Sequence, residues 1–389
     1  MIVKNEAEQL GRCLASVADV ADELLVLDTG STDDTVAIAQ SFGARVEAFA
    51  WTQNFSEARN AALQFVTGDW VLVLDADEVL VAEAVPPLRQ AMQRPSALVI
   101  NLVRQEVGAS QSPYSLVSRL FRRHPAIRFT RPYHAMIDDS VDALLQQEPD
   151  WKILSYPEVA ILHYGYAPGT IVGRNKLETA RLTMEGFLAQ HPDDPYLCSK
   201  LGALYVQMER VKAGILLLER GLASQSDPPV CYELHYHLGI AYSRQQNGVK
   251  AEQHYRAAVE QPILEALKLG AYNNLASLLQ TRGDWAGAQT LYQTCLNIDP
   301  NFAVGHYNLG MVLKAQGQLA AAAEQYQTAI RLNPTAAEFH QNLGVVLLKL
   351  GRVAESRAAF EQAITLHSST NPAEAERLRQ GLQEIGLFQ

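Results

Sequence analysis

The sequence lacks several features that would fix its class at once. No apolar run approaches the ~18–20 residues of a membrane-spanning helix, so we expect no transmembrane segment. No block of lysine and arginine is long enough for a nucleic-acid surface, and the formal net charge is −10. The 4 cysteines are scattered without metal-ligand spacing, and the first residues reach Lys4-Asn5-Glu6 without a signal peptide. These absences predict a reduced, cytoplasmic protein that does not bind nucleic acid.

What the sequence does contain is enough for more than one domain. The 389 residues are 48% hydrophobic and 19% charged, an ordinary globular balance. A chain of this length favours two or three domains over one. We expect the first half to be α/β and the second half to be entirely helical.

Two aspartates at the end of an apolar run are the central feature of the first half. Residues 71–74 read Val-Leu-Val-Leu and stop at Asp75-Ala76-Asp77-Glu78. So short and uniformly apolar a run predicts a strand buried on both faces of a parallel sheet. Ligands of open α/β sheets bind beyond the carboxyl ends of the strands, and paired carboxylates there suit a hard divalent cation with its phosphates. The simpler interpretation is an acidic turn after a strand.

The residues before this run alternate between strand and helix patterns. Residues 23–28 predict a buried strand that ends at Asp28, and residues 45–49 predict another. Ser31 or Thr32 is expected to cap the helix that follows Asp28. This doubly wound pattern would bring Asp28 and Asp75 to one crevice, where clustered carboxylates need a cation or hydroxyl donors between them.

Four motifs in the same order resemble family 2 glycosyltransferases of the GT-A fold, a Rossmann-like nucleotide-diphospho-sugar transferase fold. They are Met1-Ile-Val-Lys-Asn-Glu6, Val26-Leu-Asp-Thr-Gly-Ser-Thr-Asp33, Ala58-Arg-Asn60 and Gly68-Asp-Trp-Val-Leu-Val-Leu-Asp-Ala-Asp-Glu78. The resemblance extends to about residue 185. It implies that Asp28 contacts the nucleotide base, that Asp75 contacts the ribose and that Asp77 holds Mg²⁺ or Mn²⁺ on the diphosphate. Arg59 and Glu6 match residues beside the nucleotide, and a UDP-sugar is the expected donor.

The segment after Glu78 departs from this family in one place. Residues 97–104 and 115–121 predict two strands, and a basic cluster of Arg119, Arg122, Arg123 and Arg128 reads as a solvated edge or a phosphate site. The related proteins have His-Glu where this chain has His134-Ala135. If that glutamate is the catalytic base, the base here is missing or has moved to Asp138, Asp139 or Glu106.

Two histidines could complete the metal site. The run Ile161-Leu-His163-Tyr-Gly-Tyr166 and the helix from Thr170, with Arg174-Asn-Lys-Leu-Glu178, also match the family. Neutral imidazole is a common metal ligand, so His163 and His134 are candidates beside Asp77. A histidine at a strand end is otherwise structural.

The second half repeats itself with the tetratricopeptide pattern. The pairs Leu201-Gly202, Leu238-Gly239, Leu275-Ala276, Leu309-Gly310 and Leu343-Gly344 mark five units, the last three 34 residues apart. We predict a transferase domain over residues 1–190, including a linking helix over 170–190. Repeats follow over 193–368, the first of them degenerate, and a capping helix over 369–389.

One polar position recurs in the repeats. It holds His237, Asn274, Asn308 and Asn342, each just before the Leu-Gly or Leu-Ala step. Asparagine offers a donor and an acceptor, so such a row could bind the backbone of a protein or peptide partner on the concave face. A similar row lines the repeats of O-linked N-acetylglucosamine transferases. The alternative is a position that is polar only because it is solvated.

These observations predict an inverting, metal-dependent glycosyltransferase of the hexosyltransferase class, with helical repeats that bind a protein acceptor or partner. The alternative is an interaction scaffold whose transferase domain is degenerate and inactive; Ala135 favours it, and Asp28, Asp75 and Asp77 oppose it. A nucleotidyltransferase would need a glycine-rich, basic phosphate loop near the first strand, which residues 1–11 lack.

Overall fold

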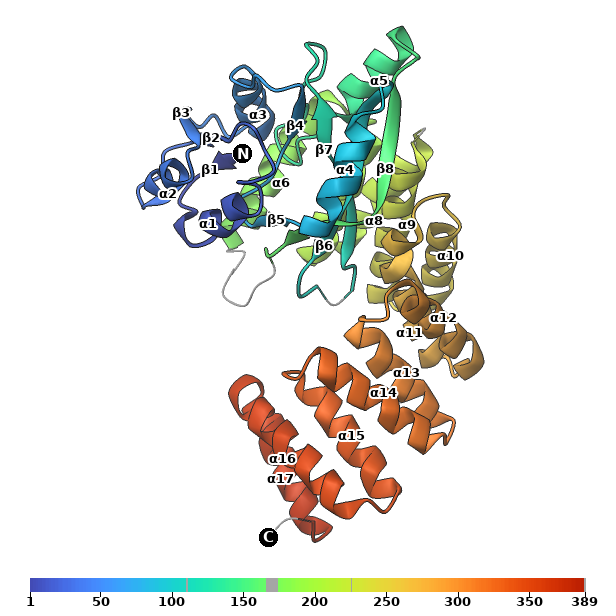
Figure 1. Ribbon diagram of the computed structural model, residues 1–389. Coiled ribbons are helices and arrows are strands. Elements are labelled where there is room, and N and C mark those ends of the chain that lie inside the picture. The colour runs from blue at the N-terminus through green and yellow to red at the C-terminus, as the bar shows by residue number, and fades with distance from the viewer. Residues whose placement is uncertain (110, 166–173, 225, 388–389) are drawn as a thin grey trace. The chain divides into compact units, whose positions relative to one another are not determined.

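The computed structural model of the chain describes residues 1–109, 111–165, 174–224 and 226–387. Two compact units divide it, Met1–Val230 and Cys231–Gln389, and each is described by itself (Figure 1). Tyr166 and the predicted helix start at Thr170 lie outside the described residues. No helix in the described ranges is both long and apolar enough to cross a bilayer.

A small parallel sheet opens the first unit, as the strand and helix pattern predicts. Its order is β1-β2-β3, with both pairings parallel. The bounds are β1 Ile2–Val3, α1 Ala7–Ala15, β2 Leu25–Asp28, α2 Thr35–Ser41, β3 Arg45–Ala48 and α3 Phe55–Leu63. Helix α1 buries Leu10, Cys13 and Leu14, which follow one another at spacings of three and four residues along one face.

The predicted cap of α2 is wrong. The helix begins at Thr35, and the carboxylate of Asp33 accepts the N–H of Thr35 at 3.1 Å. Ser31 and Thr32 are engaged elsewhere: Asn5 donates its N–H to Ser31 Oγ and accepts the N–H of Thr32 on its side chain. These bonds hold the loop after Asp28 against the end of β1.

The strand before Asp75 is not a member of the parallel sheet, which corrects the sequence prediction. It is short and pairs antiparallel with β7 in a second, five-stranded sheet of order β4-β7-β6-β8-β5. Only the β6–β8 pairing is parallel in that sheet. The bounds are β4 Trp70–Leu72, β5 Glu78–Leu80, α4 Val85–Met92, β6 Ala97–Glu106, β7 Tyr114–Arg122, α5 Asp138–Gln147 and β8 Lys152–His163. An apolar run alone does not reveal strand direction.

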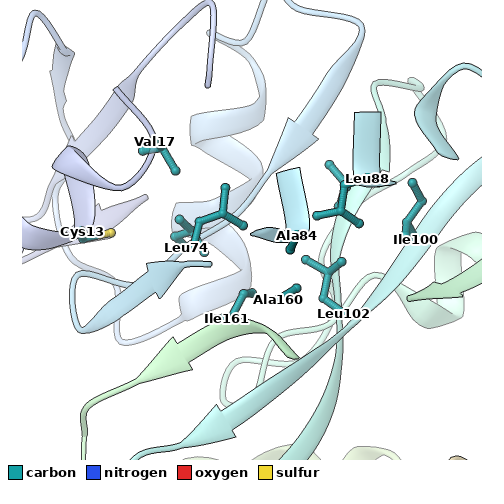
Figure 2. Packing of buried hydrophobic residues seen from close by; sticks show 11 residues of the cluster. Cys13, Val17, Leu74, Ala84, Leu88, Ile100, Leu102, Ala160 and Ile161 are labelled. Carbon is teal, nitrogen blue, oxygen red and sulfur yellow. The ribbon is translucent and has the colours of Figure 1, made fainter. Parts of the chain in front are cut away.

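A hydrophobic cluster that includes Leu74, the residue before Asp75, packs α1 against the second sheet. Figure 2 shows Leu74 among side chains from α1, α4, β6 and β8, including Cys13, Leu88, Leu102 and Ile161. All of these are buried. Because Leu74 is fixed in this cluster, the chain leaves it at a defined point to form the turn that carries the aspartates.

Three helices complete the first unit: α6 Arg174–Gln190, α7 Pro195–Gln207 and α8 Val211–Ala223. Their shared core contains Ala180, Met184, Leu197 and Leu201, and Tyr133 of the transferase domain packs against it. The first helical pair, α7 and α8, therefore clusters with the transferase domain rather than with the later repeats.

The second unit consists of antiparallel helix pairs and a final helix (Figure 1). The bounds are α9 Pro228–Arg244, α10 Gly248–Val259, α11 Leu269–Thr281, α12 Trp285–Ile298, α13 Ala303–Ala315, α14 Leu319–Leu332, α15 Ala337–Lys349, α16 Val353–Thr370 and α17 Pro372–Glu384. Glycines at the helix crossings explain the Leu-Gly steps. A Cβ at Gly310 would lie 2.7 Å from the Tyr326 ring, so a glycine lets the aromatic pack against the backbone.

Candidate active site

The Asp75-Ala76-Asp77 turn is fixed to the first sheet through its middle residue. Ala76 is buried in the cluster that also holds Val3, Leu10 and Val26. The Asp75 N–H donates to Glu78 Oε2 at 2.8 Å, and Cys13 Sγ contacts the Asp75 carbonyl oxygen at 3.3 Å. The two aspartates are therefore held where β1 and β2 end.

Asp28 and Glu6 lie at that same edge. Asp28 ends β2, and its carboxylate accepts the N–H groups of Gly30 and Ser31 at 3.1 Å. Glu6 precedes α1, and its N–H donates to Thr35 Oγ1 at 2.8 Å. The parallel pairing of Val3 with Asp28 places the two loops side by side.

Two arginines hold Asp75. Arg59 Nη2 donates to Asp75 Oδ1 and Arg119 Nη2 donates to Asp75 Oδ2, each at 2.9 Å. Burial alone would raise the pKa of Asp75, but Arg119 and Arg59 hold it well below its usual range. Asp75 therefore stays a charged acceptor in a fixed orientation. Sequence reasoning anticipated Arg59 but left Arg119 as part of either a solvated edge or a phosphate site, whereas it binds Asp75 and its side chain is only 13% exposed.

Asp77 faces His163. Its Oδ2 lies 3.1 Å from His163 Nε2, and the other ring nitrogen of His163 contacts Glu106 Oε2. Burial lowers the pKa of His163, but the hydrogen bonds to Asp77 and Glu106 outweigh it and raise the pKa to about 9. The structure thus brings together Asp77 and His163, as the sequence predicts.

Gly165 permits this approach. A Cβ at position 165 would lie 2.7 Å from His163 Cε1, 2.8 Å from Nε2 and 3.3 Å from Asp77 Oδ2. The Tyr164 N–H donates to the Asp77 carbonyl oxygen at 2.9 Å and ties the two segments together. Only a residue without a side chain fits against the imidazole here.

The third metal candidate is not part of this group. His134 is exposed in the loop between β7 and α5, with φ 52°, and its ring packs edge-on against Tyr133. Within the described ranges, no three His, Cys, Asp or Glu side chains form a group that could hold a metal ion. A cation at Asp77 and His163 would thus take its other ligands from substrate and water.

All three base candidates are bound by other side chains, and for Glu106 these are Arg104 and His163. Asp138 accepts from Ser118 Oγ at 3.0 Å, and burial raises its pKa. Ser118 and Arg119 fall at an irregularity of β7, where the pairing with β6 shifts register between Val117 and Leu120, and Asp138 lies beside Ser118, the residue before Arg119. Asp139 is held by Arg131 at 2.6 Å, and Arg131 also binds Asp194 of the α6–α7 connection at 2.8 Å.

Sequence reasoning missed most of the buried ion pairs behind the site. Arg104 Nη1 lies 2.8 Å from Glu78 Oε1, and its Nη2 lies 2.7 Å from Glu106 Oε1. Arg104 and Glu106 alternate at the end of β6, so a charged pair on one face of an otherwise apolar strand was the available signal. Arg122 is structural: it binds the Ala97 carbonyl oxygen at 2.7 Å and stacks on Trp70.

In the second unit, the asparagine row bonds to neighbouring repeats. Asn308 Nδ2 donates to Asn273 Oδ1, and Asn342 Nδ2 donates to Tyr307 Oη, each at 3.0 Å. Asn274 Oδ1 is 3.4 Å from Asn273 Nδ2, and His237 packs against the Tyr236 ring. Asn308 and Asn342 therefore each link their repeat to the preceding one, an arrangement that neither sequence interpretation anticipated.

Comparison with known families agrees with both halves. Residues 1–154 match glycosyl transferase family 2, and residues 199–263, 269–298 and 307–370 match tetratricopeptide repeats. The resemblance drawn from the motifs is confirmed. Each match covers a region that the fold also sets apart by its secondary structure.

Among known proteins, a TPR repeat-containing protein of Synechococcus elongatus is 50% identical over 284 residues, which cover 73% of this chain and 70% of that protein. The prophage-derived glycosyltransferase SunS of Bacillus subtilis is 28% identical over 50% of this chain and 46% of its own length.

Among solved structures, YrrB, described as a TPR protein with an unusual peptide-binding site, matches with a TM-score of 0.42 and 15% identity. That match covers 52% of this chain and 100% of YrrB. The chain therefore carries a domain of glycosyl transferase family 2 over residues 1–154, and tetratricopeptide repeats follow it.

Proposed function

We propose that the transferase domain moves a sugar from a nucleotide-diphospho-sugar to an acceptor hydroxyl with inversion at the anomeric carbon. The expected donor is a UDP-sugar. The observation that carries this proposal is the Asp75-Ala76-Asp77 turn. It offers one carboxylate fixed by Arg59 and Arg119 and a second that faces His163. We further propose that the helical repeats hold a protein or peptide acceptor or partner.

Asp77 and His163 fit a divalent cation. Two ligands at ~2.1 Å from an octahedral ion lie about 3 Å apart, and Asp77 Oδ2 and His163 Nε2 are 3.1 Å apart. Carboxylate and imidazole also suit Mn²⁺, and Mg²⁺ accepts the carboxylate with substrate oxygens. A bound cation would neutralise charge on the diphosphate leaving group.

The chain's own residues bind and orient the donor. Asp75 is kept charged by its two arginines, so it accepts hydrogen bonds from the ribose hydroxyls. Asp28 accepts from the nucleotide base at the end of β2, while Arg59 keeps Asp75 in place. Holding the donor in this way reduces the entropy lost in reaching the transition state.

The displacement also needs a base that takes the proton from the acceptor hydroxyl. Asp138 is the best suited of the three candidates because burial raises its pKa, whereas Arg131 binds Asp139 and both Arg104 and His163 bind Glu106. In this role Asp138 would accept the proton from an acceptor bound beside Ser118 of β7.

A thermal-shift panel tests the proposal. UDP, GDP, CDP and dTDP are each added with and without Mn²⁺ to the wild type, to Asp77→Ala and to the control Asp34→Ala. Asp34 is an exposed acid whose side chain makes no capping bond, so its loss removes the same charge away from the turn. A nucleotide at ~100 times its Kd stabilises the fold by about 2.7 kcal/mol.

We expect one nucleotide to give a shift that requires Mn²⁺, that survives in Asp34→Ala and that disappears in Asp77→Ala. A shift that is the same in Asp77→Ala would contradict the metal role of that residue. The absence of any nucleotide shift would favour the interaction scaffold with an inactive transferase domain.

A further inference from the structure

Arg104 lies at the centre of the ion pairs behind the site. Its side chain is 19% exposed and contacts Glu78, which is fully buried, and Glu106, which is 9% exposed. Arg104 Nε also donates to Glu106 Oε1 at 2.9 Å and to Ser115 Oγ at 3.2 Å. One guanidinium therefore holds two buried carboxylates in fixed orientations.

One of these carboxylates supports Asp75. Glu78 Oε2 accepts the Asp75 N–H at 2.8 Å, and it lies 3.7 Å from Arg119 Nη1. Arg119 in turn donates to Asp75 Oδ2 at 2.9 Å. Glu78 thus fixes both the backbone of Asp75 and the arginine that orients its carboxylate.

The other carboxylate supports Asp77. Glu106 Oε2 contacts His163 Nδ1, which directs the opposite ring nitrogen, Nε2, towards Asp77 Oδ2. A carboxylate on the far nitrogen of a metal-binding histidine fixes the ring and its tautomer. In the described contacts the Glu106 side chain binds His163, Arg104 and Ser115.

We propose that Arg104 is a positioning residue that couples the two aspartates of the Asp75-Ala76-Asp77 turn: through Glu78 it orients Asp75, and through Glu106 and His163 it orients Asp77. This rests on the proposed function, because it assigns Asp75 to the nucleotide and Asp77 to the cation. Arg104 contacts neither ligand. Its loss is expected to weaken both sites together.

Variants of Arg104 and Glu106 separate the connection to Asp75 from the connection to Asp77. Arg104→Met removes both contacts, and Arg104→Lys keeps the charge but loses the fork that reaches both carboxylates. Glu106→Ala removes only the contact that orients His163 towards Asp77, while Glu106→Gln keeps an oxygen that accepts from His163 Nδ1–H. The matched control is Arg122→Met, because Arg122 is a partly buried arginine on the adjacent strand that binds the carbonyl oxygens of Ala97 and Arg94.

Three measurements are made on the full chain. The first is the Kd of Mn²⁺ alone, and the second is the Kd of UDP at a Mn²⁺ concentration that saturates each variant. The third is the ¹⁵N spectrum of the histidine rings, with His163 assigned by His163→Asn. Melting temperatures confirm that each variant is folded.

We expect Glu106→Ala to weaken Mn²⁺ binding by about 10- to 100-fold and to leave the UDP Kd unchanged. Glu106→Gln should stay within about 3-fold of the wild type. Both Arg104 variants should weaken Mn²⁺ and UDP together by at least about 10-fold and shift the His163 ring resonances. Arg122→Met should do neither, even where it lowers the melting temperature.

The proposal is overturned if a folded Arg104 variant leaves both dissociation constants and the His163 resonances unchanged, or if Arg122→Met reproduces its effects. Failure of the proposed function looks different, because the wild type itself would then bind neither UDP nor Mn²⁺. In that case the His163 resonances alone decide whether Arg104 orients the imidazole.

Discussion

The two aspartates of the Asp75-Ala76-Asp77 turn are chemically unlike although only one residue separates them. Asp75 has an arginine on each carboxylate oxygen, whereas Asp77 has an imidazole on one. The first is therefore suited to accept hydrogen bonds in a fixed direction, and the second to share its site with a cation. This difference comes entirely from residues distant in the sequence.

At the residue scale, Asp138 offers a prediction about pH. Burial raises the pKa of Asp138 in the folded protein, and the nearby acids Asp142 and Asp139 raise it further. The hydrogen bond from Ser118 lowers it, but by less than burial raises it. The folded state therefore holds a proton that the unfolded state has released, so the stability contribution of Asp138 falls as pH rises above the ordinary carboxyl range.

We expect Asp138→Asn to gain in free energy of unfolding relative to the wild type between pH 4 and pH 7, because the amide still accepts from Ser118 and carries no charge. Urea unfolding at both pH values measures it. A difference that does not change with pH would contradict the raised pKa. If Asp138 is also the base, the same variant loses turnover while its UDP Kd stays constant.

Local sequence signals identified the residues that end strands. Asp28, Asp75 and Asp77 stand out because clustered acids are unusual where an apolar strand ends, and the structure confirms that each follows or closes a strand. Arg104 and Arg119 could not be paired with Glu78 and Asp75 in advance. Those pairs depend on the order of strands in the sheet: β7 lies between β4 and β6, and β8 lies between β6 and β5, which carries Glu78.

At the element scale, β4 shows that an apolar sequence pattern predicts a strand but not whether it pairs parallel or antiparallel with its neighbour. An apolar strand buried on both faces reads the same whether its neighbour runs parallel or antiparallel, and β4 pairs antiparallel with β7. The helical repeats were easier to predict, because each pair contacts mainly the next pair along the chain and the period is visible in the sequence.

The asparagine row gives a prediction at this scale. Asn308→Ala removes the donor to Asn273 Oδ1, and Asn273 is buried at 5% exposure. An unsatisfied buried acceptor costs about 1–3 kcal/mol, so we expect the unfolding free energy of the second unit to fall by that amount. The control is Asn297→Ala on the exposed side of α12. Equal stability of the two variants would contradict a role in joining repeats.

At the scale of the whole molecule, the two compact units predict two unfolding events. We expect scanning calorimetry of the full chain to resolve two transitions, and UDP with Mn²⁺ to raise the midpoint of only one of them. The variant Asp77→Ala identifies that transition as the first unit by abolishing its shift. A single transition that moves as a whole would contradict independent units.

The ion pairs of Arg131 have a consequence for how this protein can be recombined. Arg131 is 8% exposed and binds Asp139 of the transferase domain and Asp194 of the segment before α7. A chimaera joined after residue 190 would leave that buried arginine without one of its acids and would uncover the apolar face of α6. The portable transferase module therefore extends through α8, and a gene fusion that keeps α7 and α8 transfers an intact unit.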